Sequence, residues 1–326
     1  MSVFVQQQHS INDFSSSDSW VILSEIELSI KRKIEAAGTP LKDWDIQIYR
    51  GVLTGYNEAF IISTEKRDEI LANCHSEEER AKTAELIRPI LRGRDIKRYG
   101  YEWANLWLIA TFPARQYDIN NYPAVKNYLL SFAKQQLIDA GYSWVANDHL
   151  ADYCKQKLSQ TGKFIEIDGK RITLRNSQEK ARKKTSNKWF ETQDSISYWD
   201  DFSKPQIVWI ELSDDPKFAY AENITSVNTV FFMTGDNILH LLGLLNSKLV
   251  KWYFHHCIGT TSGVGTNRWL KYTIEQIPMP PVDSQLEKLS LEISKHYEQG
   301  TDTEIDLLVC KLYGLGKEET DYIIGQ

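Results

Sequence analysis

The sequence predicts an α+β fold, in which a mixed β-sheet with flanking helices is followed by a helical C-terminal region. Two runs rich in β-branched and aromatic residues, 206–212 and 227–233, are typical of strands. Elsewhere, apolar residues recur at the three- and four-residue spacing of amphipathic helices. After the stiff, proline-rich stretch Ile277–Pro281, only helical patterns follow.

The N-terminal part is expected to contain one helix and one short strand. Residues 1–17 are rich in Gln and Ser and predict disorder. The segment Asp18–Ala37 has one apolar face and begins at a residue that can cap a helix, and Gly38 ends it. Residues 44–49 then alternate as a strand.

The next part predicts a buried strand at 59–62, a charged helical segment at 65–90, a strand at 103–112 and a helix that starts at Pro123. Gly51 and Gly55 precede the first of these elements. They could cradle a phosphate or form a simple hairpin turn. No Lys-Ser/Thr pair follows them, so a nucleotide-binding loop is excluded.

Residues 163–175 give the clearest local pattern, a β-hairpin with a tight Asp168–Gly169 turn. Glu166, Asp168 and Lys170 have the spacing of part of a metal-dependent nuclease site. That interpretation is rejected, because the partner acid is missing and the hairpin explains the spacing.

The stretch 87–99 contains five cations and only one acid. The cations are Arg88, Arg92, Arg94, Lys97 and Arg98. The aliphatic residues Ile87, Ile90, Leu91 and Ile96 should anchor this stretch, so its cations should point in fixed directions. Anchored arginines suit phosphate and base-edge contacts. A solvated turn between a helix and a strand would show the same pattern.

A second basic zone follows the predicted hairpin and ends at the aromatic residues Trp189 and Phe190. Its cations are Lys170, Arg171, Arg175, Lys180, Arg182, Lys183, Lys184 and Lys188. A mobile basic loop could follow a DNA groove, or it could simply be solvated. If it binds DNA, residues 176–188 are expected to set sequence preference and residues 88–98 to set orientation.

The C-terminal half begins with a helix from Gly235, which Asn246–Ser247 should bend or split. His255–Cys257 ends this helix. Adjacent histidines on a helix point in different directions, so no shared metal is expected. The loop Gly259–Asn267, followed by Arg268, could bring backbone amides close to a phosphate or serve only as a flexible connection.

Composition limits the classes of function. The 326 residues suffice for one large domain with an appendage or for two domains. The net charge is −6, so any nucleic-acid binding would need a local basic patch. Four cysteines without a CxxC pair indicate neither a zinc site nor a disulfide framework. Without a signal core or a long apolar run, a soluble cytoplasmic protein is expected.

A set of motifs occurs in order along the chain: Arg50–Phe60, Ile90–Tyr99, Trp189–Tyr198 followed by Phe202–Ile207, Leu244–Leu249, a glycine-rich loop, Lys271–Tyr272, Ile277–Pro280, and Glu304–Val309 with Leu312–Leu315. This ordered set resembles the TaqI-like C-terminal specificity domain of type IIG restriction–modification enzymes, which is related to type I specificity subunits. The resemblance implies a twisted mixed β-sheet target-recognition domain at 46–282. A disordered N-terminus and connecting helix at 1–45 would precede it, and a helical tail at 283–326 would follow.

The resemblance further implies sequence-specific recognition of double-stranded DNA, without catalytic activity in this chain alone. The Asn-Pro-Pro-Tyr/Phe motif and the glycine-rich S-adenosylmethionine loop of the family's methyltransferase part are missing from the sequence. No cofactor, metal or catalytic residue is therefore assigned here. The chain is expected to be the recognition end of a larger enzyme. Its upstream adenine methyltransferase or nuclease part, cut away or encoded separately, would bind S-adenosylmethionine and be the second partner besides DNA.

The expected DNA-binding residues are Arg88, Arg92, Arg94, Lys97, Arg98, Arg171, Arg175, Lys180, Arg182, Lys183, Lys184, Lys188, Trp189, Gln193, Asn267 and Arg268. Two other classes stay open. A metal-dependent nuclease fragment would use Glu166, Asp168, His255 and His256 and would show magnesium-dependent cleavage. A protein-interaction module would present its C-terminal helices and bind no duplex.

Overall fold

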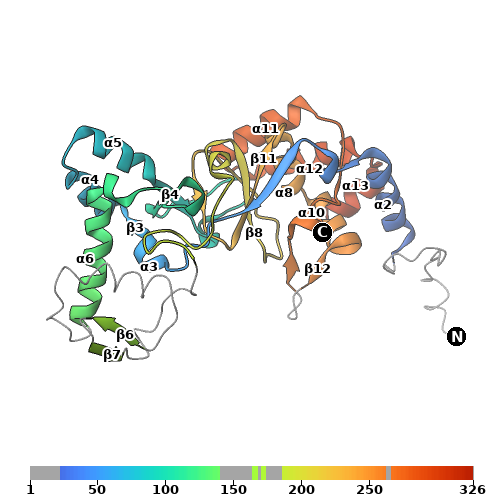
Figure 1. Cartoon of the computed structure of the whole chain (residues 1–326). Coiled ribbons are helices and arrows are strands. Elements are labelled where there is room, and N and C mark those ends of the chain that lie inside the picture. Colours follow the sequence, from blue (N-terminus) through green and yellow to red (C-terminus); the bar gives the residue numbers. More distant parts are fainter. Residues whose placement is uncertain (1–22, 140–163, 168–169, 174–185, 262–265, 326) are drawn as a thin grey trace.

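The computed structural model describes residues 23–139, 164–167, 170–173, 186–261 and 266–325. Figure 1 shows two lobes, one built around α4 to α6 and the other around α2 and α8 to α13. Helices and mainly antiparallel sheets alternate along the chain, which confirms the predicted α+β class. In these residues no helix has both the length and the apolar character needed to cross a membrane.

The first lobe is a four-stranded sheet covered by helices. Its strands are β3 (Ile61–Ser63), β4 (Ile87–Leu91), β5 (Leu106–Ile109) and β10 (Thr225–Ser226), in the order β10-β4-β5-β3. Its helices are α3 (Asn57–Phe60), α4 (Thr64–Ala72), α5 (Glu77–Leu86) and α6 (Pro123–Asp139). The sheet is mixed, because β4 pairs antiparallel with β5 but parallel with β10. The predicted hairpin is present as β6 (Phe164–Ile167) and β7 (Lys170–Thr173).

A second sheet separates two hydrophobic cores. Its strands are β2 (Ile46–Arg50), β8 (Gln206–Ile210), β9 (Ala219–Ala221) and β11 (Val230–Gly235), in the order β2-β11-β8-β9. Side chains alternate between the faces of a strand. Val208 and Phe232 therefore enter the core of the first lobe. Ile207 and Met233 enter the core of the second. Both faces of this sheet are buried, and the two lobes share it as a wall.

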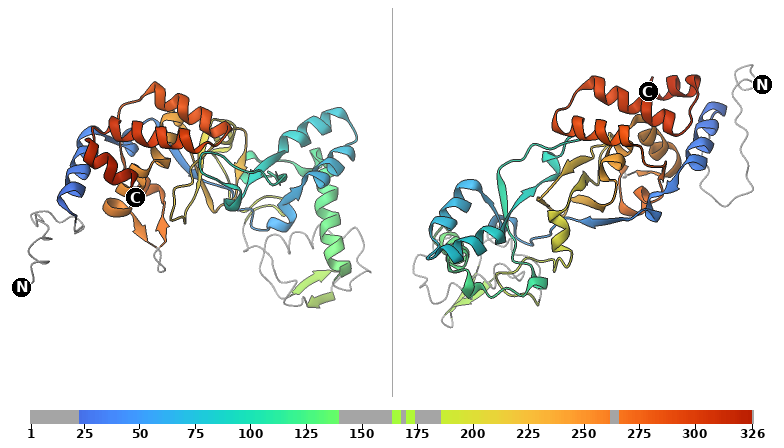
Figure 2. Two further views of the ribbon diagram at one scale, coloured as in Figure 1. Left: turned by 180° about the vertical axis from the view of Figure 1, so that it is seen from behind. Right: turned by 90° about the horizontal axis from the view of Figure 1, so that it is seen from above.

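The second lobe is mainly helical, and it combines a helix from the N-terminal part of the chain with helices from the C-terminal part. They are α2 (Glu25–Ala37), α8 (Ile238–Asn246), α9 (Lys248–Tyr253), α10 (Lys271–Ile274), α11 (Ser284–Lys295), α12 (Gln299–Leu312) and α13 (Lys317–Ile324). The short strands are β1 (Thr39–Pro40), β12 (Thr260–Thr261), β13 (Asn267–Arg268) and β14 (Pro278–Met279). A Cβ at Gly243 of α8 would lie 2.6 Å from Leu286 Cδ1, so this glycine allows α11 to pack closely. Figure 2 shows α11 to α13 lying on this lobe. They share one core with α2 and α8. The boundary at residue 282 between a recognition domain and a helical tail stays a prediction.

Several predicted elements are confirmed and three are corrected. The segment predicted to be helical over 65–90 forms α4 and α5, but from Ile87 it is strand β4. Asn246–Ser247 splits the long helix into α8 and α9, and residues 278–279 are extended as expected. The first helix begins at Glu25 because Ser24 and Glu27 form a capping box; Asp18 lies outside the described residues. The strand predicted for 59–62 begins only at Ile61, as β3, because residues 57–60 form the helical turn α3. An apolar run as short as 59–62 shows no periodicity that separates helix from strand.

Candidate nucleic-acid interface

The predicted basic stretch is anchored as expected, but its cations point to different places. Ile87, Ile90, Leu91 and Ile96 are all buried. The Arg92 guanidinium donates two hydrogen bonds to the Asp95 carboxylate, at 3.1 and 2.8 Å. Burial alone would raise the pKa of Asp95, but the hydrogen bonds from Arg92 outweigh it and lower that pKa. Arg92 is thus largely committed to the fold.

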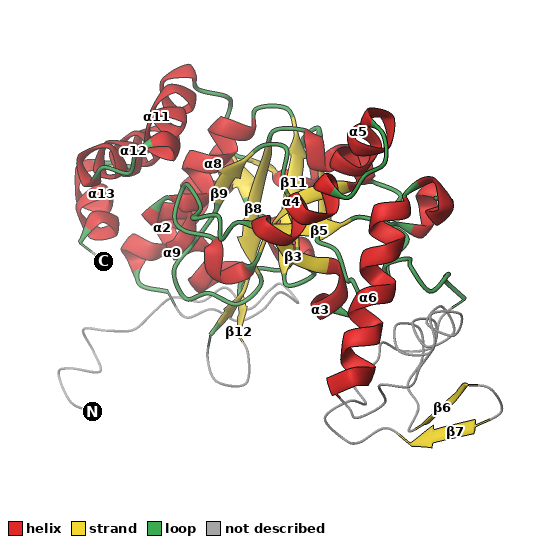
Figure 3. Ribbon diagram, turned by 90° about the vertical axis from the view of Figure 1, so that its left-hand side faces the viewer, coloured by secondary structure: helices red, strands yellow, loops and turns green. Residues whose placement is uncertain are grey.

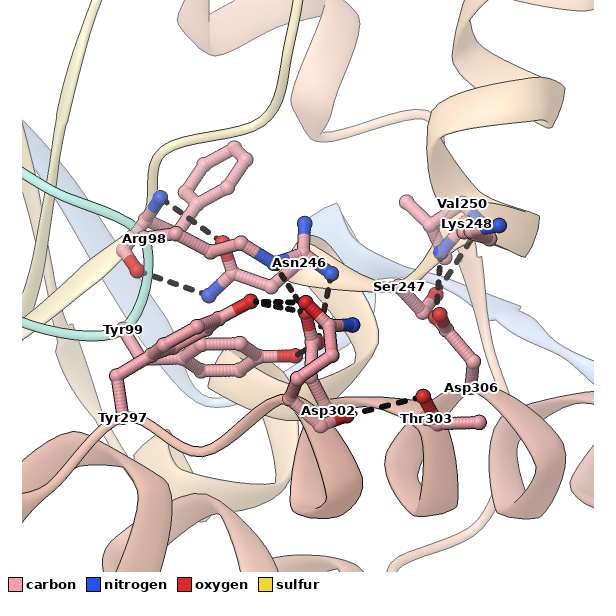
Figure 4. A network of polar contacts seen from close by, with 12 residues as sticks. Arg98, Tyr99, Asn246, Ser247, Lys248, Val250, Tyr297, Asp302, Thr303 and Asp306 are labelled. Carbon is pink, nitrogen blue, oxygen red and sulfur yellow. Dashed lines mark hydrogen bonds and ion pairs between the residues drawn. The ribbon is translucent and has the colours of Figure 1, made fainter. Parts of the chain in front are cut away.

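Arg98 is also committed to an internal partner, as Figure 4 shows. Its guanidinium donates to both carboxylate oxygens of Asp302 on α12, at 3.0 and 2.8 Å. The hydroxyls of Tyr99 and Tyr297 donate to the same carboxylate at 2.7 and 3.0 Å. Asp302 is buried. This network fixes residues 98–99 to the C-terminal helices, so Arg98 serves the fold and is not displayed for DNA.

A second carboxylate lies one turn further along α12. Asp306 accepts a hydrogen bond of 2.8 Å from the backbone N–H of Lys248, the first residue of α9. Burial raises the pKa of Asp306 to about 6. A helix N-terminus favours a carboxylate acceptor, which offsets part of this burial cost.

Arg88 turns towards another part of the molecule. Its guanidinium carbon lies 4.9 Å from the ring centre of Trp199, and a guanidinium nitrogen donates to Ser203 Oγ at 3.5 Å. Of the five predicted cations, this leaves Arg94 and Lys97 as the exposed ones. Lys97 lies 3.5 Å from the exposed carboxylate of Glu102.

Arg94 and Lys97 border a surface hollow of about 370 Å³, which we call the basic hollow. Its wall comes from four separate segments of the chain: Arg50, Gly93, Arg94, Ile96, Lys97, Ile210, Glu211, Leu212, Lys217 and Thr229. Four of these residues are cations and one is an acid. A protein with net charge −6 thus carries a local concentration of positive charge here.

The single acid of the basic hollow, Glu211, organises two arginines. Arg268 Nη2 and Nε donate to Glu211 Oε1 at 2.5 and 3.2 Å. An Arg50 nitrogen lies 3.9 Å from Glu211 Oε2, and Arg50 Nε donates to the Asn228 carbonyl at 2.6 Å. Beside them, Leu212 is 50% exposed and Tyr272 is 58% exposed. Large exposed apolar groups beside cations are typical of binding surfaces.

Two hairpins project on one side of the molecule, opposite α11. Figures 1 and 3 both show β6–β7 and the β12–β13 pair on that side. The described part of the second basic zone includes the backbone of Lys170 and Arg171 in β7. Arg175, Lys180, Arg182, Lys183 and Lys184 lie outside the described residues.

The remaining predicted residues differ in exposure. Lys188 is exposed and its amine donates to the Tyr117 carbonyl at 3.4 Å. Trp189 and Gln193 are half-buried. Asn267 is only 1% exposed, so its side chain does not lie on the surface where a base contact was expected. Its neighbour Arg268 does lie there.

Sequence reasoning missed Arg50, Lys217, Leu212 and Tyr272 as surface residues. Arg50 opens one of the quoted motifs and Tyr272 follows Lys271 in the region of another, so the motifs were a usable signal for these two. Lys217 and Leu212 had none, because only the fold brings their loop to the basic hollow.

Within the described residues, no cluster of three or more His, Cys, Asp or Glu side chains could hold a metal ion. His256 Nδ1 lies 2.8 Å from the Trp252 carbonyl, and its ring stacks on Trp252. His255 is exposed. Asp168, part of the nuclease alternative, lies outside the described residues.

Comparison with solved structures gives the fold a context. The type IIL restriction–modification enzyme MmeI, solved in complex with DNA, matches at 12% identity and a TM-score of 0.43, over 88% of this chain and 33% of that one. The type IIG restriction endonuclease BpuSI matches at 12% identity and a TM-score of 0.50, over 91% of this chain and 32% of that one. The present chain thus spans about a third of their length.

A comparison with curated proteins gives no match. The likeness to BpuSI concerns the fold alone. The TaqI-like C-terminal specificity domain matches residues 88–279, which include nearly all of β4, both hairpins, strands β8, β9 and β11 of the second sheet, and every residue of the basic hollow except Arg50. That match covers more than half of the chain, and we conclude that the protein belongs to this family of specificity domains.

Proposed function

We propose that this chain recognises a specific sequence in double-stranded DNA, as the specificity part of a type IIG-like restriction–modification enzyme. It would position an adenine for flipping into a methyltransferase pocket elsewhere in that enzyme. S-adenosylmethionine and any nuclease chemistry would belong to that other part, and the assembly would act on DNA in the cytoplasm. Membership of a specificity-domain family and the basic hollow together support this proposal.

The basic hollow is the observation that carries the proposal. Arg94, Lys97 and Lys217 are exposed there on a protein whose overall charge is negative. Uniform attraction to DNA is therefore not expected, and binding must depend on this patch. A two-stranded β-ribbon fits the major groove, and two hairpins project on one side of the molecule. One of them, β12–β13, adjoins the hollow through the backbone bridge between Arg268 and Leu212. The hollow would hold phosphates while projecting elements reach base edges.

Salt-dependent binding of duplex DNA tests the proposal. Fluorescence anisotropy of a labelled duplex would be measured at several salt concentrations with the wild-type chain and with an Arg94→Ala, Lys97→Ala, Lys217→Ala variant. We expect the log–log slope against salt to fall by about 0.9 for each phosphate contact removed.

The matched control removes two exposed cations that do not line the basic hollow. Lys288→Ala, Lys295→Ala changes α11, which Figure 3 shows far from the projecting hairpins. This variant should keep the wild-type slope. An equal loss in the two variants would mean that attraction is diffuse and that the basic hollow is not the interface. A folded wild-type chain that binds no duplex would instead favour a protein-interaction module.

A further inference from the structure

The pair formed by Arg268 and Glu211 has a geometry suited to reading a base. Arg268 uses Nε and Nη2 on a single carboxylate oxygen, Oε1. A guanidinium has five N–H donors in a fixed planar fork. The side edge of the fork is thus occupied, and its end edge, which carries one Nη1 hydrogen and one Nη2 hydrogen, makes no hydrogen bond to the described residues. The Arg268 side chain is 43% exposed, so this end faces solvent.

The same pair is poorly suited to a phosphate. A phosphate beside Arg268 would also lie close to the negative charge of Glu211, and like charges repel. Arg94, Lys97 and Lys217 line the same hollow, but within the described residues none of them hydrogen-bonds to Glu211, so their charge remains available to a phosphate. Base edges carry no net charge, so two hydrogen-bond donors held in a fixed direction contribute more to binding a base than net positive charge does. The chain thus separates charge for phosphates from directed donors for bases.

The backbone that carries Arg268 is held rigidly. Trp269 donates its backbone N–H to the Glu211 carbonyl at 2.8 Å and its indole N–H to the Ser213 carbonyl at 2.8 Å. The indole of Trp209 donates to the Trp269 carbonyl at 2.9 Å. Trp269 is buried and stacks on Phe254 with ring centres 3.7 Å apart. Rigid support of this kind reduces the entropy lost when the side chain binds.

From this geometry we infer that Arg268 reads a guanine in the major groove, donating from its end edge to O6 and N7, and that Glu211 is the positioning residue that aims it. The inference rests on the proposed function and adds to it a named base and two named side chains. Leu212, half exposed beside the pair, would lie against the neighbouring base pair.

The test is selection of bound sequences from a random duplex library by the full 326-residue chain, followed by affinities for the selected site and its single-base variants. The wild type should require guanine at one position. Arg268→Ala should abolish that requirement and lower affinity for the guanine site by about 5- to 150-fold, the range typical of a bidentate base contact. Arg268→Lys should also lose it, because lysine keeps the charge but not the fork.

Glu211→Gln distinguishes positioning from a general structural role. It should reduce discrimination at the same base pair, and in an Arg268→Ala background it should have little further effect. A merely structural residue would weaken binding to all duplexes equally. Arg94→Ala is the matched control and should weaken all duplexes alike.

Thermal unfolding would verify that each variant is folded. A wild type that selects no sequence would overturn the proposed function and this inference with it. A wild type that selects a site, together with an Arg268→Ala variant that selects the same site, would overturn this inference and leave the proposed function intact.

Discussion

Replacing Asp302 with alanine should destabilise the protein strongly, although this residue lies far along the chain from the basic hollow. Its carboxylate accepts hydrogen bonds from Arg98, Tyr99 and Tyr297 (Figure 4). Removing one partner of a buried ion pair typically costs about 3–5 kcal/mol. The Arg98 side chain keeps 25% of its exposure, so water can still solvate part of its charge. We therefore expect a cost near the lower limit, about 3 kcal/mol.

Asp306 provides the contrasting variant. Its folded pKa of about 6 lies above the ordinary value of 3.8, so the stability that it contributes is fully present below pH 3.8 and is lost as pH rises through about 6. Above that pH, ionised Asp306 costs at most about 3 kcal/mol. Asp306→Asn retains an oxygen for the Lys248 N–H. It should raise the melting temperature at pH 8 and have little effect at pH 4.

Circular dichroism melts at pH 4 and pH 8 would measure both variants. Asp302→Ala should lower the midpoint at pH 8 by roughly 5–10 °C. It should also weaken DNA binding, because residues 98–99 anchor the loop that carries Arg94 and Lys97. If the two variants shift the midpoint in the same direction at pH 8, the assignment of one carboxylate as a structural anchor and the other as a burial cost is wrong.

Four further outcomes are expected. Calorimetry should show no saturable binding of S-adenosylmethionine, because the sequence lacks the methyltransferase motifs; measurable saturation would contradict this. Purified protein should contain no stoichiometric zinc, and zinc lost on substituting His255–Cys257 would show that the two histidines do share a metal. Exchange of residues 176–188 for another loop should change the selected sequence, and an unchanged sequence would remove that loop from base reading. Gly243→Ala should destabilise the protein by about 1–3 kcal/mol, because its Cβ would meet Leu286 and Ser290 at 2.6 Å; an unchanged melt would show that α11 can move away.

Local patterns predicted the fold well where a single element carries its own periodicity. The split at Asn246–Ser247 followed from two poor helix-interior residues, and Ser247 does cap α9. The hairpin followed from its turn. The strand predicted for 59–62 was partly wrong, because only the surrounding packing makes residues 57–60 helical.

The candidate site was less predictable, since charge in a sequence does not reveal its partner. Arg98 is paired with an aspartate 204 positions away, and no local rule relates the two. Arg92 is paired only three positions away, with Asp95, the one acid of its stretch. Conversely, Lys217 belongs to no basic run, yet the fold brings it beside Arg94.

The sheet β2-β11-β8-β9, which separates the two cores, affects how the sequence of such a protein can change in evolution. Strands β2 and β8 both pair antiparallel with β11, so they run parallel to each other. The chain leaves this sheet after Arg50 and returns at Gln206, two strand spacings or about 10 Å to the side. Nearly all of the first lobe is thus one long excursion between neighbouring points.

Recombination between relatives at these two points would transplant residues 51–205 as a cassette. Glu211 and Arg268 would stay behind in the recipient. The cassette would still be completed by β10, whose pairing with β4 runs through backbone groups at Thr225 and Ile90 and so tolerates changes of side chain. On the proposed function, the DNA contacts of the cassette and those of the recipient would then come from different ancestors, and new specificities would arise by recombination as well as by point mutation.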